Sequence, residues 1–174
     1  MLTAARQLLG WRLRTEFEGV PTEVVITEVE AYAGLDDPAS HAYRGRTKRN
    51  GSLFGGPGTL YVYLSYGIHW CMNVVIGDPG TPNAVLLRGG EPVLGLDTMV
   101  SRRGRADHVA DGPGKLTQAL GVTDTDDGID LGRGRVQLIP AETPAIGRVL
   151  TTPRIGISKA ADWPWRFVLE RRSG

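Results

Sequence analysis

A predicted strand that ends in two carboxylates constrains this chain more than any other segment. Residues 24–30 begin with three β-branched residues and continue Thr-Glu-Val-Glu, a composition typical of a β-strand. Because side chains alternate along a strand, Glu28, Glu30 and Tyr32 are expected to share one face. A turn rich in Gly, Asp and Pro follows, and His41 brings an imidazole back after it. Periodicity alone leaves two interpretations open, a solvated strand edge with a loop histidine or the beginning of a catalytic site.

Glycine content limits the architecture further. The chain has 24 glycines among 174 residues, roughly twice the usual share of ~7%. Such a content predicts many tight turns, with more sheet and loop than long helix. The length suits one domain, residues 1–174, and no repeat or linker divides it. The net charge of +1 does not by itself indicate a nucleic acid partner, so local clusters of charge have to decide that.

Cysteine usage and hydropathy exclude several classes. A single cysteine, Cys71, excludes an intrachain disulfide and a cysteine-based zinc site. The N-terminus has no apolar signal region, and no run approaches ~18 apolar residues. These features predict a soluble protein of a reducing compartment, with no membrane partner.

The most basic part of the chain follows His41 directly. Arg44, Arg46, Lys48 and Arg49 place four cations within six residues, and an Asn-Gly pair closes the segment. A solvated positive loop is the ordinary explanation for such a run. Its position beside the carboxylates and an aromatic residue instead favours contacts with phosphates.

Residues 59–76 predict a hairpin with an unusual tip. Apolar residues alternate with Tyr61 and Tyr63 on the first strand, and Gly67 permits a tight turn before the second. The tip residue is Tyr66, although turn tips usually carry small polar residues. An exposed aromatic ring at a turn tip more often inserts into a partner or contacts one than it lacks a role.

Two further segments carry potential phosphate ligands. Arg102, Arg103 and Arg105 form a second basic cluster. Gly114 and Lys115 begin a short predicted helix, where free backbone N–H groups bind phosphate. The sequence is not a Walker A loop.

The remaining elements are short. An acidic stretch at 123–130 is expected to be a solvated loop, because its spacing does not fit a calcium loop. The other predicted strands are residues 11–17, 84–88, 135–139, 154–157 and 167–171. A helix is predicted at residues 4–9, a loop with a short helix at 92–102, and a short helix that follows Lys115 and ends at Leu120.

Several functions fit these features. Glu28 and Glu30 would lie about 7 Å apart on one strand face, within the range of inverting sugar hydrolases. An uncharged glycan, however, needs neither the tip tyrosine nor two arginine clusters. A non-enzymatic binder of distorted DNA would need the tyrosines and arginines but no carboxylate. A metal site has no supporting ligand spacing; its candidate ligands are Glu28, Glu30, Asp36, Asp37 and His41.

Taken together, these motifs resemble the 3-methyladenine (alkyladenine) DNA glycosylase family. The resemblance runs in order through nearly the whole chain, and Leu53 is the one departure, standing where methionine is expected. The matching positions are 27–32, 41, 46–50, 58, 60–63, 66–67, 71–73, 86–88, 91–92, 112–116 and 153–157.

The resemblance implies a single-domain α+β fold, with a curved, mostly antiparallel β-sheet, short helices and a protruding β-hairpin. It implies an enzyme of DNA base-excision repair that removes alkylated or deaminated purines with an activated water. Strand cleavage needs an amine nucleophile, and the chain offers only Lys48, Lys115, Lys159 and its N-terminus, none of which adjoins Glu30 in sequence. We therefore expect a monofunctional enzyme. No cofactor or metal is implied. The expected partner is damaged double-stranded DNA, and the expected state is a monomer. The expected location is the bacterial cytoplasm beside the nucleoid, or a eukaryotic nucleus.

The resemblance also assigns roles to single residues. Glu30 would be the general base, a choice favoured over Glu28 because it lies nearer the strand end and beside Tyr32. Tyr66 would fill the gap left by the flipped nucleotide. Arg88 would hold the catalytic water, and the base pocket would be formed by Tyr32, His41, Tyr63 and Asn73. The expected contacts with the DNA backbone are Arg44, Arg46, Lys48, Arg49, Arg102, Arg103, Gly114 and Lys115.

Overall fold

The 14-residue strand β2 (Val20–Ala33) is the centre of the sheet in the computed structural model, which describes residues 1–142 and 147–170. One edge of β2 pairs along most of its length with a single strand, and the other edge is shared by two strands in succession. All three pairings are antiparallel. The single partner is β5 (Asn83–Leu94), and the two successive partners are β1 (Arg12–Phe17) and β8 (Arg166–Glu170).

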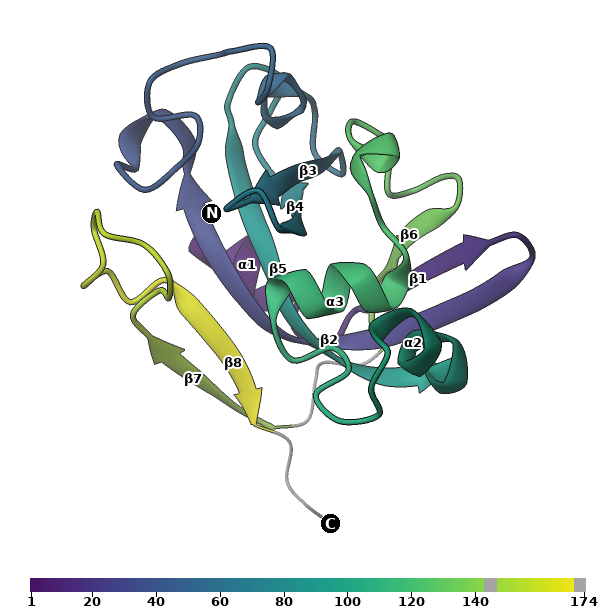
Figure 1. Ribbon diagram of the computed structural model, residues 1–174. Helices are drawn as coiled ribbons and strands as arrows, with labels where there is room; N and C mark the ends of the chain where they lie inside the picture. The colour runs from purple at the N-terminus through teal and green to yellow at the C-terminus, as the bar shows by residue number, and fades with distance from the viewer. Residues whose placement is uncertain (143–146, 171–174) are drawn as a thin grey trace.

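Within the described residues the sheet has eight strands, and every pairing between them is antiparallel. Figure 1 shows that it curls, with β7 and β8 splayed to one side of β2. Register shifts near Glu23, Ile26 and Glu28 mark bulges that bend β2. The predicted α+β fold with a curved antiparallel sheet is confirmed. The other strands are β3 (Leu60–Ser65), β4 (His69–Val75), β6 (Val136–Ile139) and β7 (Arg148–Thr152).

The helices are short, and glycines bound α2 (Leu96–Arg103) and α3 (Pro113–Leu120). Gly104 and Gly121 adopt the left-handed backbone that ends α2 and α3, at φ of 68° and 70°. α3 packs against β4 and β5, and α2 packs against α3 (Figure 1). Within residues 1–142 and 147–170, no helix is long and apolar enough to cross a membrane. The α-helices are α1 (Leu2–Gln7), α2 (Leu96–Arg103) and α3 (Pro113–Leu120), and single 3-10 turns lie at Gly34–Asp36, Gly51–Phe54 and Asp124–Asp126.

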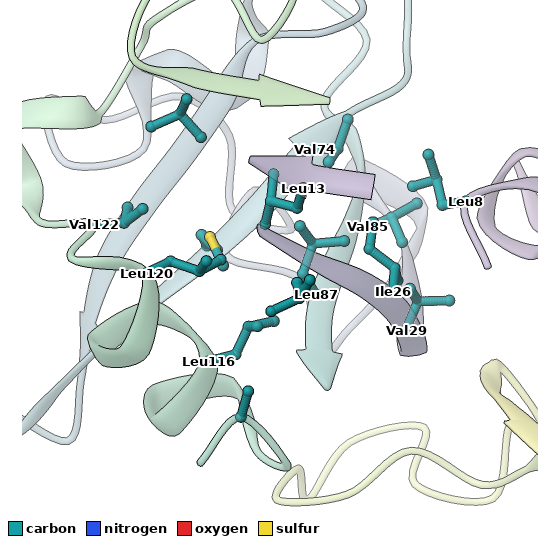
Figure 2. Packing of buried hydrophobic residues seen from close by; sticks show 14 of the residues in the cluster. Leu8, Leu13, Ile26, Val29, Val74, Val85, Leu87, Leu116, Leu120 and Val122 are labelled. Carbon is teal, nitrogen blue, oxygen red and sulfur yellow. The ribbon is translucent and has the colours of Figure 1, made fainter. Parts of the chain in front are cut away.

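Alternation along the strands separates the core from the opposite face of the sheet. In β2, Val29 and Ala31 are fully buried in the main core, and in β5 Val85 and Leu87 join them. Figure 2 shows these strands meeting α3, whose Leu116 packs into the same cluster. The intervening residues of the same strands point away from this core and leave the second face free for a site.

One predicted strand is wrong. Residues 154–157 form an irregular segment, and the strand of this region is β7 (Arg148–Thr152) instead. Pro153 has no N–H to donate to a ladder, and the N–H of Ile155 donates to a carboxylate of β2. The predicted strand at 167–171 corresponds to β8, although Arg171 lies outside the described residues.

The acidic stretch at 123–130 is not simply solvated, as its composition had predicted. Asp126 is only 2% exposed and forms an ion pair with Arg135. Its carboxylate also accepts from the N–H of Thr123 at 2.9 Å, so it caps the 3-10 turn. Asp127 accepts from the N–H of Val62 at 2.9 Å and joins the stretch to β3. These carboxylates therefore hold the fold together.

We expect Asp126→Ala to lower the free energy of unfolding by about 3 kcal/mol, because it leaves a partly buried guanidinium without its partner. Asp124→Ala, which removes an exposed carboxylate of the same turn, should change it by less than about 0.5 kcal/mol. Urea denaturation of both variants measures the difference. Equal losses would contradict a special role for the Asp126–Arg135 pair.

Candidate active site

A cavity of about 420 Å³ opens on the face of the sheet opposite the main core. Its walls come from the ends of β2 and β5, the β3–β4 hairpin, the loop that ends at His41, and the segment 155–157. This volume lies in the range of small-molecule sites. Segments from distant parts of the sequence therefore meet around one hollow.

The strand register places four side chains of this face in one row. Glu30 of β2 pairs with Leu86 of β5, Leu86 with Asn73 of β4, and Asn73 with Tyr61 of β3. Cross-strand partners lie side by side on the same face of a sheet. The row leads from a buried carboxylate to an aromatic wall, and Asn73 lies between them.

Glu30 is a fully buried charge, with 0% of its side chain exposed. Its Oε2 accepts from the hydroxyl of Tyr32 at 2.9 Å, and its Oε1 accepts from the backbone N–H of Ile155 at 2.8 Å. Arg88 Nη1 lies 3.3 Å from the same Oε1. A buried carboxylate is tolerated only with such partners. Tyr32, Arg88 and Ile155 also line the cavity, so Glu30 lies directly beneath its floor.

Glu28 holds two guanidinium groups rather than facing solvent. Its Oε1 accepts from Arg88 Nε and from Arg166 Nε, each at 2.7 Å. Burial alone would raise the pKa of Glu28, but the hydrogen bonds from the two arginines outweigh it and lower that pKa. Burial opposes the charge of Arg88, yet the charges of Glu30 and Glu28 raise its pKa. Arg88 is thus a fixed cation between two carboxylates.

The aromatic wall contains one residue more than the sequence predicts. His41 and Tyr63 meet edge to face with ring centroids 4.4 Å apart, and Tyr61 stacks on Tyr63 at 5.5 Å. Tyr61 also bonds His41 Nδ1 at 3.0 Å, and burial raises its pKa to about 12. Burial, aided by nearby Arg49, lowers the pKa of His41, so its ring is neutral at neutral pH. The tyrosine alternation on the strand was the signal for Tyr61.

The basic segment borders the cavity. Asn50 is buried and donates to the carbonyl of His41 at 2.8 Å, which ties the base of the segment to the wall. Arg49 donates to the carbonyl of Leu64 at 2.9 Å and lines the cavity. Three other cations, Arg44, Arg46 and Lys48, are exposed beside it.

Tyr66 projects from the hairpin tip, with 84% of its surface exposed. Its backbone is left-handed at φ 50°, as is that of Gly67 at φ 70°. Such a pair matches type I′ hairpin turns, in which a tyrosine is a costly first residue. Its hydroxyl donates to the carbonyl of Gly156 at 3.2 Å, across the mouth of the cavity.

The two ends of α3 have different surroundings. At its beginning, Gly114 lies so close to His69 that an added Cβ would approach the His69 Cβ to 2.8 Å, and Lys115 pairs with Asp111 at 2.9 Å. This end adjoins the hairpin. At the other end, Arg102 donates to the carbonyl of Ala119 at 3.0 Å, and Arg103 bonds Gln118. The structure therefore brings Gly114 and Lys115 near the tip, while Arg102 and Arg103 tie α2 to α3.

The site also contains a buried ion pair that residue spacing did not predict. Asp37 and Arg154 form an ion pair whose side chains are both 0% exposed, although 117 positions separate them. This pair brings the segment between β7 and β8 to the end of β2, as Figure 1 shows. Arginines already bond the carboxylates of Glu28 and Asp37, so these two candidate ligands are not free to bind a metal ion. In the part of the chain that the structure describes, no group of three or more His, Cys, Asp or Glu residues could hold a metal ion.

Comparison with known proteins identifies the family. The family model described as methylpurine-DNA glycosylase matches residues 1–173 of this chain. The chain belongs to the methylpurine-DNA glycosylase family. The family match therefore covers the sheet, the cavity and the hairpin.

Relatives of this glycosylase-family chain cover nearly all of it. A protein of Frankia casuarinae is 51% identical, covering 97% of this chain and 84% of its own. One of Methanoculleus marisnigri is 50% identical, covering 97% and 90%. One of Rubrobacter xylanophilus is 46% identical, covering 93% and 85%. Each of the three bears the name "Putative 3-methyladenine DNA glycosylase".

The left-handed tip predicts an unusual order of stability among variants of this family member. Both Tyr66→Ala and Tyr66→Gly remove the exposed ring, but only glycine relieves the backbone strain. We expect the glycine variant to exceed the alanine variant by about 1 kcal/mol in free energy of unfolding. Chemical denaturation measures this difference, and an alanine variant at least as stable would contradict the strained turn.

Proposed function

We propose that this protein is a monofunctional DNA glycosylase of base-excision repair, with a single catalytic domain over residues 1–174. It flips alkylated or deaminated purines out of duplex DNA and hydrolyses their N-glycosidic bond. The observation that carries the proposal is the buried carboxylate of Glu30 beside Arg88, beneath an aromatic cavity with Tyr66 exposed at its rim. The family match supports the same class of reaction.

Flipping requires compensation for the lost stacking. A base inside a duplex is out of reach of a carboxylate, and unstacking it costs a few kcal/mol. Tyr66 fills the gap in the stack, and Tyr32, His41 and Tyr63 receive the base in the cavity. Stacking on aromatic rings tolerates different purines, and a cationic alkylated purine gains an additional attraction to them.

Bond cleavage uses the charges below the floor. As the N-glycosidic bond breaks, its electron pair leaves with the base, and the sugar becomes oxocarbenium-like. The carboxylate of Glu30 stabilises this cation and takes a proton from the water that attacks C1′. Arg88 helps to hold that water and the neighbouring phosphate. A cationic alkylated purine departs as a neutral base, so it needs no general acid. A neutral base such as hypoxanthine departs as its anion and takes its proton from water.

Substrate selection falls to the neutral groups of the pocket. Asn73 is the cross-strand neighbour of Leu86, which in turn pairs with Glu30. There the amide of Asn73 meets the edge of an inserted purine. The neutral His41 ring does not repel a cationic base. These properties favour alkylated and deaminated purines as a class.

DNA contacts follow the rim of the cavity. We assign phosphate contacts to Arg44, Arg46, Lys48 and Arg49 on one side, and to Gly114 and Lys115 on the other. Arg102 and Arg103 remain predicted phosphate contacts. Their side chains already hydrogen-bond α3, so a phosphate would have to compete with those bonds. Such a protein acts as a monomer on damaged duplex DNA, at the nucleoid of a bacterial or archaeal cytoplasm.

The alternatives are less well supported. A sugar hydrolase needs a second free carboxylate, whereas Glu28 is held by two arginines. A non-enzymatic DNA binder has no use for a buried, fully bonded Glu30. Strand cleavage needs an amine nucleophile, and no lysine is among the described residues that line the cavity.

We expect Glu30→Gln to slow base release at least about 100-fold, because general bases contribute 10²–10⁴ to the rate. Lesion binding should change little, since the amide keeps the size of the side chain. The assay measures free base and uncut abasic strand from a duplex with one hypoxanthine, and free 3-methyladenine from methylated DNA.

Glu23→Gln is the matched control for this variant. It makes the same change on the same strand, at a buried residue that pairs with Arg12 away from the cavity. Its rate should stay within threefold of the parent rate. The assignment of Glu30 fails if the two variants release base at similar rates.

We expect Tyr66→Ala and Tyr66→Gly to slow excision from duplex DNA by about one to two orders of magnitude, because stacking is worth roughly 1–3 kcal/mol. Excision from a single strand should suffer much less, since no stack has to be refilled. A paired assay on the same lesion in both contexts measures this. An equal loss in both contexts would mean that Tyr66 shapes the pocket rather than filling the duplex.

A further inference from the structure

Arg154 is buried behind the cavity, in contact with Tyr32, which lines it. Its guanidinium bonds both oxygens of Asp37, with Nη2 at 3.0 Å from Oδ1, and its Nη1 donates to the carbonyl of Ala31 at 3.0 Å. Its Cζ lies 4.6 Å from the ring centre of Tyr32. Two further rings surround it, those of Trp163 and Trp165, at 5.6 and 5.2 Å.

This arginine touches two of the three donors of Glu30. Tyr32, whose hydroxyl donates to Oε2, lies against the guanidinium itself. Ile155, whose N–H donates to Oε1, is the next residue in the chain. Only Arg88, the third donor, is held by other groups, through Glu28. The geometry of the buried carboxylate therefore depends on where Arg154 is held.

The location of Asp37 explains how it fixes the position of Arg154. It follows directly after β2 and the 3-10 turn Gly34–Asp36, and its carboxylate also accepts from the N–H of Ala39 at 2.9 Å. The loop that carries Asp37 continues to His41, which also lines the cavity. One ion pair thus joins the end of β2, the loop to His41 and the segment 154–157.

We propose that Arg154, held by Asp37, is a positioning residue that fixes the Tyr32 hydroxyl and the Ile155 N–H on Glu30 and so aims the general base. This inference rests on the proposed function, because it assumes that Glu30 takes the proton of the attacking water. Asp37 is bonded to the same end of β2 and carries Arg154 rather than touching Glu30.

The chain contains a close structural counterpart that lacks a connection to the site. Arg135 also bonds both oxygens of an aspartate, Asp126, and donates to a backbone carbonyl, that of Gly121. It likewise lies over an aromatic ring, 5.0 Å from the centre of Phe17. Arg154→Lys and Arg135→Lys therefore remove equivalent forked hydrogen bonds while keeping the positive charge.

The test compares these two variants in single-turnover base release from a duplex with one hypoxanthine, after circular dichroism has verified folding. The dependence on enzyme concentration separates the maximal rate from the half-saturating concentration. We expect Arg154→Lys to lower the maximal rate about 10- to 100-fold, since small misplacements of catalytic groups have effects of that size. Its half-saturating concentration, and both constants of Arg135→Lys, should stay within threefold of the parent values.

A second variant tests the proposal if Arg154→Lys does not fold. An amide-to-ester replacement at Ile155 deletes the N–H donor, makes the carbonyl of Arg154 a weaker acceptor and leaves every side chain in place. We expect it to slow the maximal rate about tenfold, the effect of one hydrogen bond to a charged group. An unchanged rate would contradict the proposal.

The outcomes separate this inference from the function on which it rests. If the parent protein releases no base from hypoxanthine duplex or from methylated DNA, the proposed function itself fails. If the parent is active and Arg154→Lys matches Arg135→Lys in maximal rate, the positioning role alone is overturned. The same holds if the Arg154→Lys effect is confined to the half-saturating concentration.

Discussion

The need to satisfy one buried carboxylate organises much of this structure. Glu30 has no contact with solvent, so its charge must be balanced by donors inside the protein. The donors come from Tyr32 on the same strand, Arg88 on β5 and Ile155 near the C-terminus. Three segments that are far apart in sequence therefore converge on one side chain, and the cavity lies where they meet.

Strand β2 makes this convergence compatible with a stable core. Its alternate residues Val29 and Ala31 pack with Val85 and Leu87, while Glu30 and Tyr32 take the opposite face. The same alternation continues through the neighbouring strands, so one face of the sheet supplies apolar burial and the other supplies chemistry. Core packing then fixes the site indirectly, because a shift of register by one residue would exchange the two faces.

The site also separates charged from neutral groups. Charge is concentrated at and beneath the floor, in Glu28, Glu30 and Arg88, whereas the walls carry tyrosines, a neutral His41 and one cation, Arg49. Under the proposed function, such an arrangement would stabilise a developing cation at the sugar while the base itself meets uncharged rings. Exposed cations lie outside the cavity mouth, in the segment around Lys48, where a polyanionic backbone can be held without entering it.

Local sequence determined the alternation on β2, the hairpin with Tyr66 at its tip and the basic segment, because these features depend on periods of two and on turn chemistry within a few residues. It did not determine the Asp37–Arg154 pair, the double hold on Glu28 or the irregular segment at 154–157. Those contacts join residues 60 or more positions apart, or arise because a backbone N–H finds a carboxylate in place of a strand partner. Only the tertiary structure decided them, since burial makes such pairings necessary and no local pattern encodes which distant partner will meet the need.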